Sequence, residues 1–304
     1  MALRYQTVTF LSDYGLVDEF VGVVHSVIRT IAPEAHVIDL THQIAPFDTR
    51  AAGLALARSA QYLCPGVVMA VVDPGVGGTR RSIAVEVGDG QSVLIGPDNG
   101  LLAPAVAMCG GATAAVLLDK PDYQLPAPGA TFAGRDVFAP AAAHLCNGVP
   151  LGEVGTEIDP AGLLPGILPL TREEDDALVA EVLWVDSFGN AQLNVDPDEV
   201  EGWGDRIALR FGGTTRTGVI VDHYSAVTPG MVGLVVDSYG LLSIALDQAS
   251  AAADYGLRPS TEVHLVRFDD EQEMGSGGGL STAVSLTSKR TAPATEESEK
   301  SEAS

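Results

Sequence analysis

The chain has 304 residues, 46% of them hydrophobic, and a formal net charge of −23 at pH 7. Its length exceeds the roughly 100 to 200 residues of a typical domain, so two domains are expected. The negative charge argues against binding nucleic acid or an anionic membrane surface, because both need clustered Lys and Arg. No apolar run approaches the roughly 20 residues of a membrane span, and the N-terminus does not resemble a signal peptide. We therefore expect a cytoplasmic globular protein.

The first 150 residues alternate strand-like runs with helical patterns. Strands are predicted at 7–11, 36–40, 67–72, 82–87, 92–95 and 114–118, and helices at 17–31, 49–62 and 136–146. Asp98 and Asn99 are predicted to cap a further helix that runs towards Met108. This alternation predicts an α/β domain with a mostly parallel sheet.

The chain changes character after residue 150. Residues 151–174 are rich in proline and glycine, which is typical of a connector between domains. Residues 175–270 contain six short apolar runs separated by turn signals, which predict a small all-β barrel or sandwich. Residues 271–304 have almost no large apolar side chains and are predicted to be a disordered tail.

The apolar run 67–72 ends at Asp73 and is followed by a glycine-rich loop that reaches Arg80. A continuously apolar run is expected of a parallel strand covered on both faces. Open α/β sheets bind ligands outside the carboxyl ends of their strands, so this acid is a candidate site residue. A surface turn that happens to carry an acid is the alternative.

Polar residues follow several of the predicted strands and are expected to line one crevice. They are Asp13, Thr41, His42, Asp73, Asp98 and Asn99. Asp13 could accept hydrogen bonds from ribose hydroxyls, although a helix N-cap is equally open. A structural loop role is favoured for His42, because His36 lies at the other end of the preceding strand and no cysteine is close.

Other signatures give little support to competing classes. The glycine-rich turn of a dinucleotide site, the P-loop and the nucleophile elbow of serine hydrolases are all missing from the sequence. The three cysteines, Cys64, Cys109 and Cys146, are scattered in apolar segments. They are predicted to be buried small hydrophobes, with neither a disulfide nor a metal site.

Four segments together resemble one family, in the order in which the family carries them. They are Val71–Arg81, Gly96–Leu102, Thr131–Pro140 and Asp186–Asn190. The family is that of the S-adenosylmethionine hydroxide adenosyltransferases, hydrolytic relatives of the S-adenosylmethionine-dependent fluorinases and chlorinases. The similarity covers roughly residues 7–268. It implies attack by water or hydroxide on the 5′ carbon of S-adenosylmethionine, which releases adenosine and L-methionine.

The resemblance also carries expectations about assembly and cofactors. It implies a homotrimer, with each active site between the N-terminal domain of one subunit and the C-terminal domain of its neighbour. S-adenosylmethionine is the substrate, so neither a cofactor nor a metal is expected.

An Asp-Arg-His set belongs to these hydrolases, and Asp73 and Arg80 match its first two members. Ala133 stands where the family has the histidine, and alanine cannot relay a proton. Gly134 follows it, where the fluorinase carries serine. Two explanations compete: a naturally divergent or slow enzyme, or a histidine replaced to trap substrate. The second is favoured, because Asp73, Arg80 and the residues after Ala133 still match the family.

The resemblance further implies a set of binding residues. Asp13 matches the ribose-binding acid and Phe47 an aromatic residue near the ribose. Asp186 and Ser238 match contacts to the methionine amino and carboxylate groups, Phe188 the ring that stacks on adenine, and Asn190 the side chain that recognises adenine. Tyr239 stands where the fluorinase carries arginine, so carboxylate recognition departs from the family. A core position remains the alternative for Phe188.

Three other functions stay open. A halide-using adenosyltransferase is disfavoured, because a carboxylate at Asp73 repels halide, whereas the halogenases carry tyrosine there. An S-adenosylmethionine sensor without turnover would keep the binding residues and lose the nucleophile machinery, as Ala133 partly suggests. A purely structural trimer would bind nothing.

Overall fold

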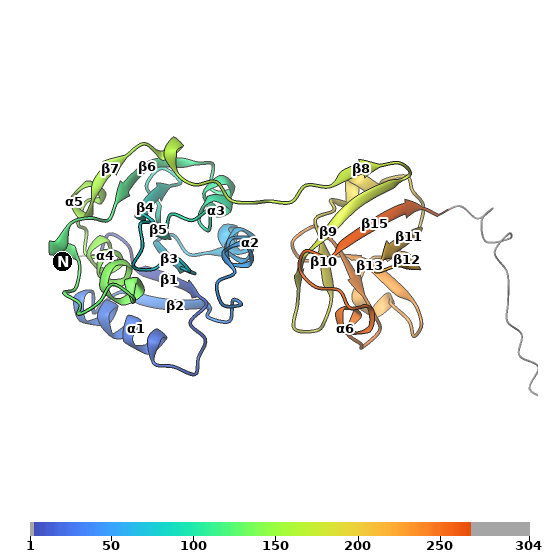
Figure 1. Ribbon diagram of the computed structural model, residues 1–304, viewed down its shortest axis with the longest axis horizontal. Helices are drawn as coiled ribbons and strands as arrows, with labels where there is room; N and C mark the ends of the chain where they lie inside the picture. Colours follow the sequence, from blue (N-terminus) through green and yellow to red (C-terminus); the bar gives the residue numbers. More distant parts are fainter. Residues whose placement is uncertain (1–2, 269–304) are drawn as a thin grey trace, which may run out of the picture. The chain divides into compact units, whose positions relative to one another are not determined.

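The computed structural model describes residues 3–268, which contain an N-terminal α/β domain and a C-terminal β domain (Figure 1). In the N-terminal domain the strands are β1 (Thr7–Ser12), β2 (His36–Thr41), β3 (Val67–Val71), β4 (Ser82–Val87), β5 (Ser92–Pro97), β6 (Ala112–Leu117) and β7 (Thr156–Ile158). Its helices are α1 (Phe20–Ile31), α2 (Thr49–Ser59), α3 (Ala103–Met108), α4 (Ala139–Cys146) and α5 (Leu151–Val154). The predicted strands and helices of this domain are therefore present.

These seven strands form one sheet in the order β2-β1-β3-β5-β4-β6-β7. The pairs β1–β2, β1–β3 and β3–β5 are parallel, whereas β4 is antiparallel to both β5 and β6, and β7 is antiparallel to β6. All strands except β4 and β7 thus run in one direction. The prediction of a mostly parallel sheet is confirmed.

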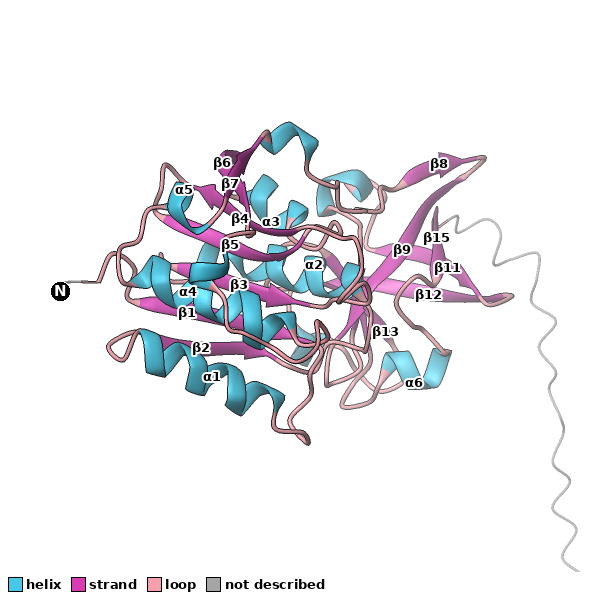
Figure 2. Cartoon of the chain, turned by 60° about the vertical axis from the view of Figure 1, so that its left-hand side comes forward, coloured by secondary structure: helices cyan, strands magenta, loops and turns pink. Residues whose placement is uncertain are grey.

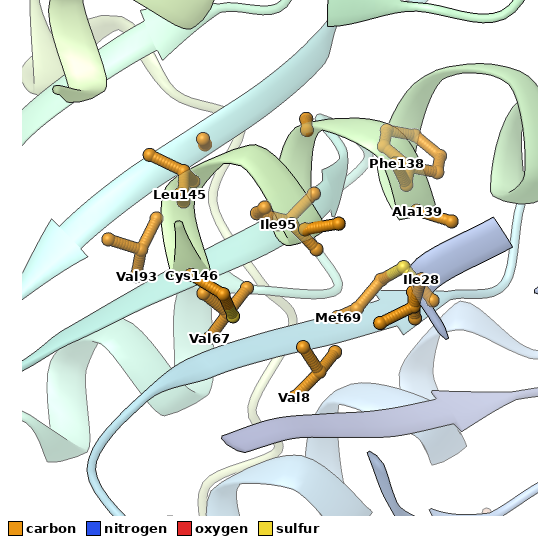
Figure 3. Close-up of a cluster of buried hydrophobic side chains, with 14 of the residues drawn as sticks. Val8, Ile28, Val67, Met69, Val93, Ile95, Phe138, Ala139, Leu145 and Cys146 are labelled. Atoms are coloured by element: carbon orange, nitrogen blue, oxygen red, sulfur yellow. The ribbon is translucent and has the colours of Figure 1, made fainter. Parts of the chain in front are cut away.

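Helices cover both faces of this sheet (Figures 1 and 2). Alternate residues of β3 explain why: Val67, Met69 and Val71 pack in the cluster that includes α1 and α4, and Val68 and Ala70 in the cluster that includes α2. Figure 3 shows the first of these clusters, in which Met69 lies near Ile28 of α1. Burial on both faces is the physical reason for the continuously apolar run before Asp73.

The end of the N-terminal domain differs from the prediction. The sheet continues past residue 150, because α5 and β7 follow and β7 pairs with β6. The proline- and glycine-rich signal is genuine but begins later, at the 3₁₀ turn Pro160–Gly162. A strand of only three residues carries too short an alternation to be recognised in the sequence.

The C-terminal domain is a β-barrel. Its strands are β8 (Arg172–Glu174), β9 (Ala177–Val185), β10 (Ala191–Leu193), β11 (Arg206–Phe211), β12 (Thr214–Val221), β13 (Val232–Val236), β14 (Leu242–Ala245) and β15 (Glu262–Arg267), with one short helix, α6 (Ala251–Tyr255). Their order is β10-β14-β13-β12-β11-β15-β9-β8, and an additional β10–β9 pairing closes the ring with β8 outside it. The barrel is thus confirmed and the sandwich alternative is wrong.

Two smaller predictions are also wrong. Cys64 is exposed and Cys109 is half-buried, so only Cys146 is a buried hydrophobe. The helix α3 begins after Leu102 and receives no side-chain cap from Asp98 or Asn99. The predicted tail, 271–304, lies outside the described residues. Among the residues that are described, no helix combines the length and the apolar character that crossing a membrane requires.

Candidate active site

The carboxylate of Asp73 lies just beyond β3 and is held by Arg80. Nε of Arg80 lies 2.9 Å from each carboxylate oxygen, and its Nη2 lies 2.5 Å from Oδ2. The Asp73 side chain is only 6% exposed, which contradicts the surface-turn alternative. The guanidinium also donates to Ser82 Oγ and lies over the ring of Phe138. Arg80 is therefore fixed from several directions and fixes the acid in turn.

Asp73 opens onto a cavity of about 510 Å³ in the N-terminal domain. Its wall includes Asp13, Tyr14, Phe47, Asp73 and Ala133. The predicted ribose acid, the predicted aromatic and two members of the predicted catalytic set therefore meet at one place. Burial raises the pKa of the Tyr14 hydroxyl well above its ordinary value, so Tyr14 stays protonated and can act there as a hydrogen-bond donor.

Asp13 and Phe47 are linked through the main chain. The backbone N–H of Phe47 donates to Oδ2 of Asp13 at 2.9 Å. Phe47 has a φ of 70°, a left-handed conformation that is uncommon for a bulky residue, and its side chain is 72% exposed. Helix α1 begins after Glu19, so Asp13 is not its N-cap. Such a strained, exposed aromatic residue is characteristic of functional sites.

A different segment brings Ala133 to the wall of the same cavity. Ala133 is 7% exposed and precedes the π-helical turn Gly134–Phe138, which runs directly into α4. A Cβ atom added to Gly134 would overlap the hydroxyl of Tyr14. A larger residue at this position would therefore have to displace the Tyr14 side chain.

The predicted crevice is only partly correct. Asp13 and Asp73 line the cavity, but the buried carboxylate of Asp98 pairs with Arg81 and accepts the backbone N–H of Leu164. The amide of Asn99 donates to the carbonyl of Val72. Asp98 and Asn99 are thus structural residues that hold the loop after β5. Thr41 likewise stays local, since its Oγ1 accepts the backbone N–H of Gln43.

A second cavity, of about 840 Å³, lies in the C-terminal domain. Asp186, Phe188, Asn190, Ser238 and Tyr239 all line it. The side chain of Phe188 is 79% exposed, so the alternative of a core position is wrong. The structure thus brings together every C-terminal residue that the resemblance implies.

The loop that carries Phe188 is built around Asp186. Oδ1 of Asp186 accepts the backbone N–H groups of Phe188 and Asn190, and Oδ2 accepts the Asn190 amide at 2.8 Å. This arrangement is an Asx-type turn, in which an acid satisfies the backbone of the residues that follow it. Gly189, between the two, has a φ of 86°. Asp186 therefore presents Phe188 and Asn190 to the cavity.

Two residues beside this cavity carry no clear signal in the sequence. Asp237 repeats the pattern of Asp186, with Oδ1 accepting the backbone N–H of Tyr239 at 2.8 Å. Arg58 of α2 lies over the rings of Trp184 and Tyr239, at 4.4 and 5.6 Å from their centroids. An arginine late in a helix gives no sign of a partner more than a hundred residues away. Only the fold brings a cation next to Tyr239.

Comparison with known proteins decides the family. Residues 8–155 match the N-terminal domain of the SAM hydroxide adenosyltransferases and residues 180–264 match the C-terminal domain. The chain belongs to this family. It is 41% identical to an (R)-S-adenosyl-L-methionine hydrolase of Salinispora tropica, over 85% of this chain and 97% of the relative.

Further relatives agree with this placement. An (R)-S-adenosyl-L-methionine hydrolase of Thermus thermophilus is 40% identical over 85% of this chain and 99% of its own, whereas a fluorinase of Actinopolyspora mzabensis is only 26% identical over 86% and 97%. A solved structure of an uncharacterized conserved protein from Thermotoga maritima superposes with a TM-score of 0.79 at 30% identity. It covers 86% of this chain and all of that one.

Proposed function

We propose that the protein hydrolyses S-adenosyl-L-methionine to adenosine and L-methionine. The observation that carries the proposal is the buried Asp73–Arg80 pair on the wall of a cavity, in a chain whose similar relatives are named as hydrolases of this substrate. Those relatives' names specify the (R) form, so both sulfonium epimers belong in the assay.

The residues of the two cavities fit the chemistry. Water attacks C5′ of the ribose, the C5′–S bond breaks, and its electron pair stays on sulfur, so the sulfonium leaves as neutral methionine. Asp73 orients the water and takes its proton as general base, and Arg80 holds the carboxylate of that acid in place. A sulfonium is a good leaving group, so alignment and exclusion of bulk water supply most of the remaining catalysis.

Binding is assigned to both domains. Asp13 holds the ribose and Phe47 packs beside it, while Phe188 stacks on adenine and Asn190 reads its edge. Asp186 and Ser238 hold the methionine amino and carboxylate groups, with Gly134 keeping the wall beside Tyr14 open. Arg58, next to Tyr239, supplies positive charge near the carboxylate in place of the fluorinase arginine.

Ala133 in the histidine position lowers turnover, because neither its methyl group nor the neighbouring Gly134 can relay a proton. The proposal also includes a homotrimer in which each active site is formed between two subunits. The protein is proposed to act in the cytoplasm. The assignment of each site to two subunits is supported by the presence of two distinct cavities, one in each domain, each of which carries only part of the proposed substrate contacts.

The decisive assay combines chromatography with calorimetry. Incubation with each epimer should release adenosine and methionine in equal amounts. Binding without product would instead support a sensor, the second candidate function, which Ala133 favours. If neither binding nor product is detected, both functions are excluded.

A further inference from the structure

A cluster of two imidazoles and one carboxylate lies in the N-terminal domain, where α1, β2 and the loop after β2 meet. Nε2 of His25, from α1, lies 2.8 Å from Oδ1 of Asp39, from β2. Nε2 of His42 lies 3.0 Å from the same oxygen. The potential ligand atoms of these three residues all lie within 4.8 Å of one another. Neither Asp73 nor the rest of the proposed chemistry uses them.

His42 provides an independent observation. Its side chain is 2% exposed, yet its buried Nε2 has no hydrogen-bond partner of proper geometry, despite the nearby Asp39 oxygen. A buried polar atom without a partner costs free energy and calls for an explanation. This unpartnered atom lies within 4.8 Å of the potential ligand atoms of His25 and Asp39.

The other ring nitrogen of His42 is also held. Nδ1 lies 2.8 Å from Oγ of Ser12, which is fully buried and also accepts the backbone N–H of Tyr14. When Nδ1 carries the proton and donates it to Ser12, the lone pair of Nε2 is free to bind a cation. Metal-binding histidines commonly fix their tautomer in this way. Because Ser12 is buried, the Ser-His-Asp arrangement is unsuited to nucleophilic attack.

We propose that His25, Asp39 and His42 bind one divalent transition-metal ion of the zinc class. Two imidazoles and one carboxylate form a ligand set that zinc accepts, with water filling the fourth position. Tetrahedral ligands about 2 Å from zinc lie roughly 3.3 Å apart, so the two His–Asp separations need to open by only a few tenths of an ångström. His25 and Asp39 are partly exposed, which gives the ion a path of entry.

The ion would tie α1, β2 and the loop after β2 together beside the substrate cavity. The carbonyl of His42 accepts the backbone N–H of Gly15 at 2.8 Å, two residues after Asp13. A metal at His42 would therefore stiffen the loop that presents the proposed ribose acid. This role is structural and is independent of whether the chain hydrolyses S-adenosylmethionine. It revises the sequence-based expectation for His42, which considered His36 and not His25.

Calorimetric titration of the chelator-treated full chain with zinc chloride tests the proposal. One ion per chain should bind, and cobalt(II) should give a ligand-field spectrum without thiolate bands. His25→Ala and Asp39→Asn should each weaken binding at least about tenfold, and Ser12→Ala by about 10- to 100-fold. His36→Ala is the matched control, because His36 is an exposed histidine of the same strand outside the cluster, and should leave binding unchanged.

Folding of each variant is checked by circular dichroism, and zinc should raise the melting temperature of the parent and the control but not of His25→Ala. Absence of zinc binding would overturn the proposal and leave the cluster as a hydrogen-bonded brace. Binding that survives His25→Ala, or that is lost with Cys64→Ser, would equally overturn it.

Discussion

The guanidinium of Arg80 donates hydrogen bonds to both carboxylate oxygens of Asp73, with Nε at 2.9 Å from each. Their side chains are 16% and 6% exposed, so the pair is shielded from solvent screening. A charge-assisted pair of this kind fixes geometry as well as charge. The arrangement holds the Asp73 carboxylate in one orientation at the cavity wall, where a general base for water has to lie.

Asp73→Asn tests that role in the Ala133→His background, where turnover should be highest. Adenosine formation should fall by about 10²- to 10⁴-fold, because the amide cannot take the proton of water. Loss of the charge partner of Arg80 should also lower the free energy of unfolding by about 3 kcal/mol. Turnover kinetics and urea unfolding measure the two effects, with exposed Asp122→Asn as control. Undiminished turnover would rule out Asp73 as the base.

Ala133→His should raise adenosine formation by about 10²- to 10⁴-fold, the usual contribution of a positioned acid–base group. Ala133 lines the same cavity as Asp73, so an imidazole at this position would lie in the cavity that contains the proposed base. Ala133→Leu fills similar space without a proton relay and should give no gain. An equal rate in all three proteins would show that this position does not limit turnover.

Gly134→Ser should destabilise the chain by about 1 to 3 kcal/mol, because its Cβ has to displace the Tyr14 hydroxyl. Tyr14→Phe in the same chain removes that hydroxyl and should restore part of the loss. Thermal unfolding of the single and double variants measures the coupling. Strictly additive effects would mean that the two residues do not compete for space.

Phe188→Ala should weaken binding of S-adenosylmethionine by about 10- to 100-fold, the usual effect of losing one stacking ring. Its melting temperature should not change, since the ring is 79% exposed. Leu170→Ala removes another exposed apolar side chain, one outside the cavity, and should leave the affinity unaltered. Calorimetry decides, and an unchanged affinity would remove Phe188 from the binding set.

Mixing Asp73→Asn with Phe188→Ala subunits tests where the sites are completed. If each site joins two subunits of a trimer, random mixed assembly restores about a quarter of the sites. If each site lies within one chain, co-refolding restores none. Activity of the mixture relative to each variant alone therefore distinguishes the two arrangements.

Much of the fold was predictable because it rests on local patterns. The continuous apolar run of β3 and the alternating pattern of the barrel strands both follow from burial, which can be inferred from the order of apolar and polar residues in the sequence. β7 and β10, of three residues each, were missed because so short a strand has no periodicity to detect. Asp98 was misassigned to a helix cap, since its partners Arg81 and Leu164 are brought to it only by the fold.

Some residues of the candidate site could likewise be predicted from the sequence, and others could not. Asp73 and Asp186 stand at strand ends, where an acid is conspicuous in the sequence. The convergence of Ala133 on Asp73, and of His25 on His42, depends on long-range packing that no local pattern encodes. For Phe188 the sequence favoured a stacking role and left a core position as the alternative, which its exposure in the structure excludes.

The most direct measurement is hydrolysis in water enriched in oxygen-18, followed by mass spectrometry of the products. We predict adenosine that carries one heavy oxygen at its 5′ position, together with unlabelled methionine, formed slowly by this chain and faster after Ala133→His. Unlabelled adenosine, a 5′-halogenated nucleoside, or no nucleoside product from either protein would contradict this prediction.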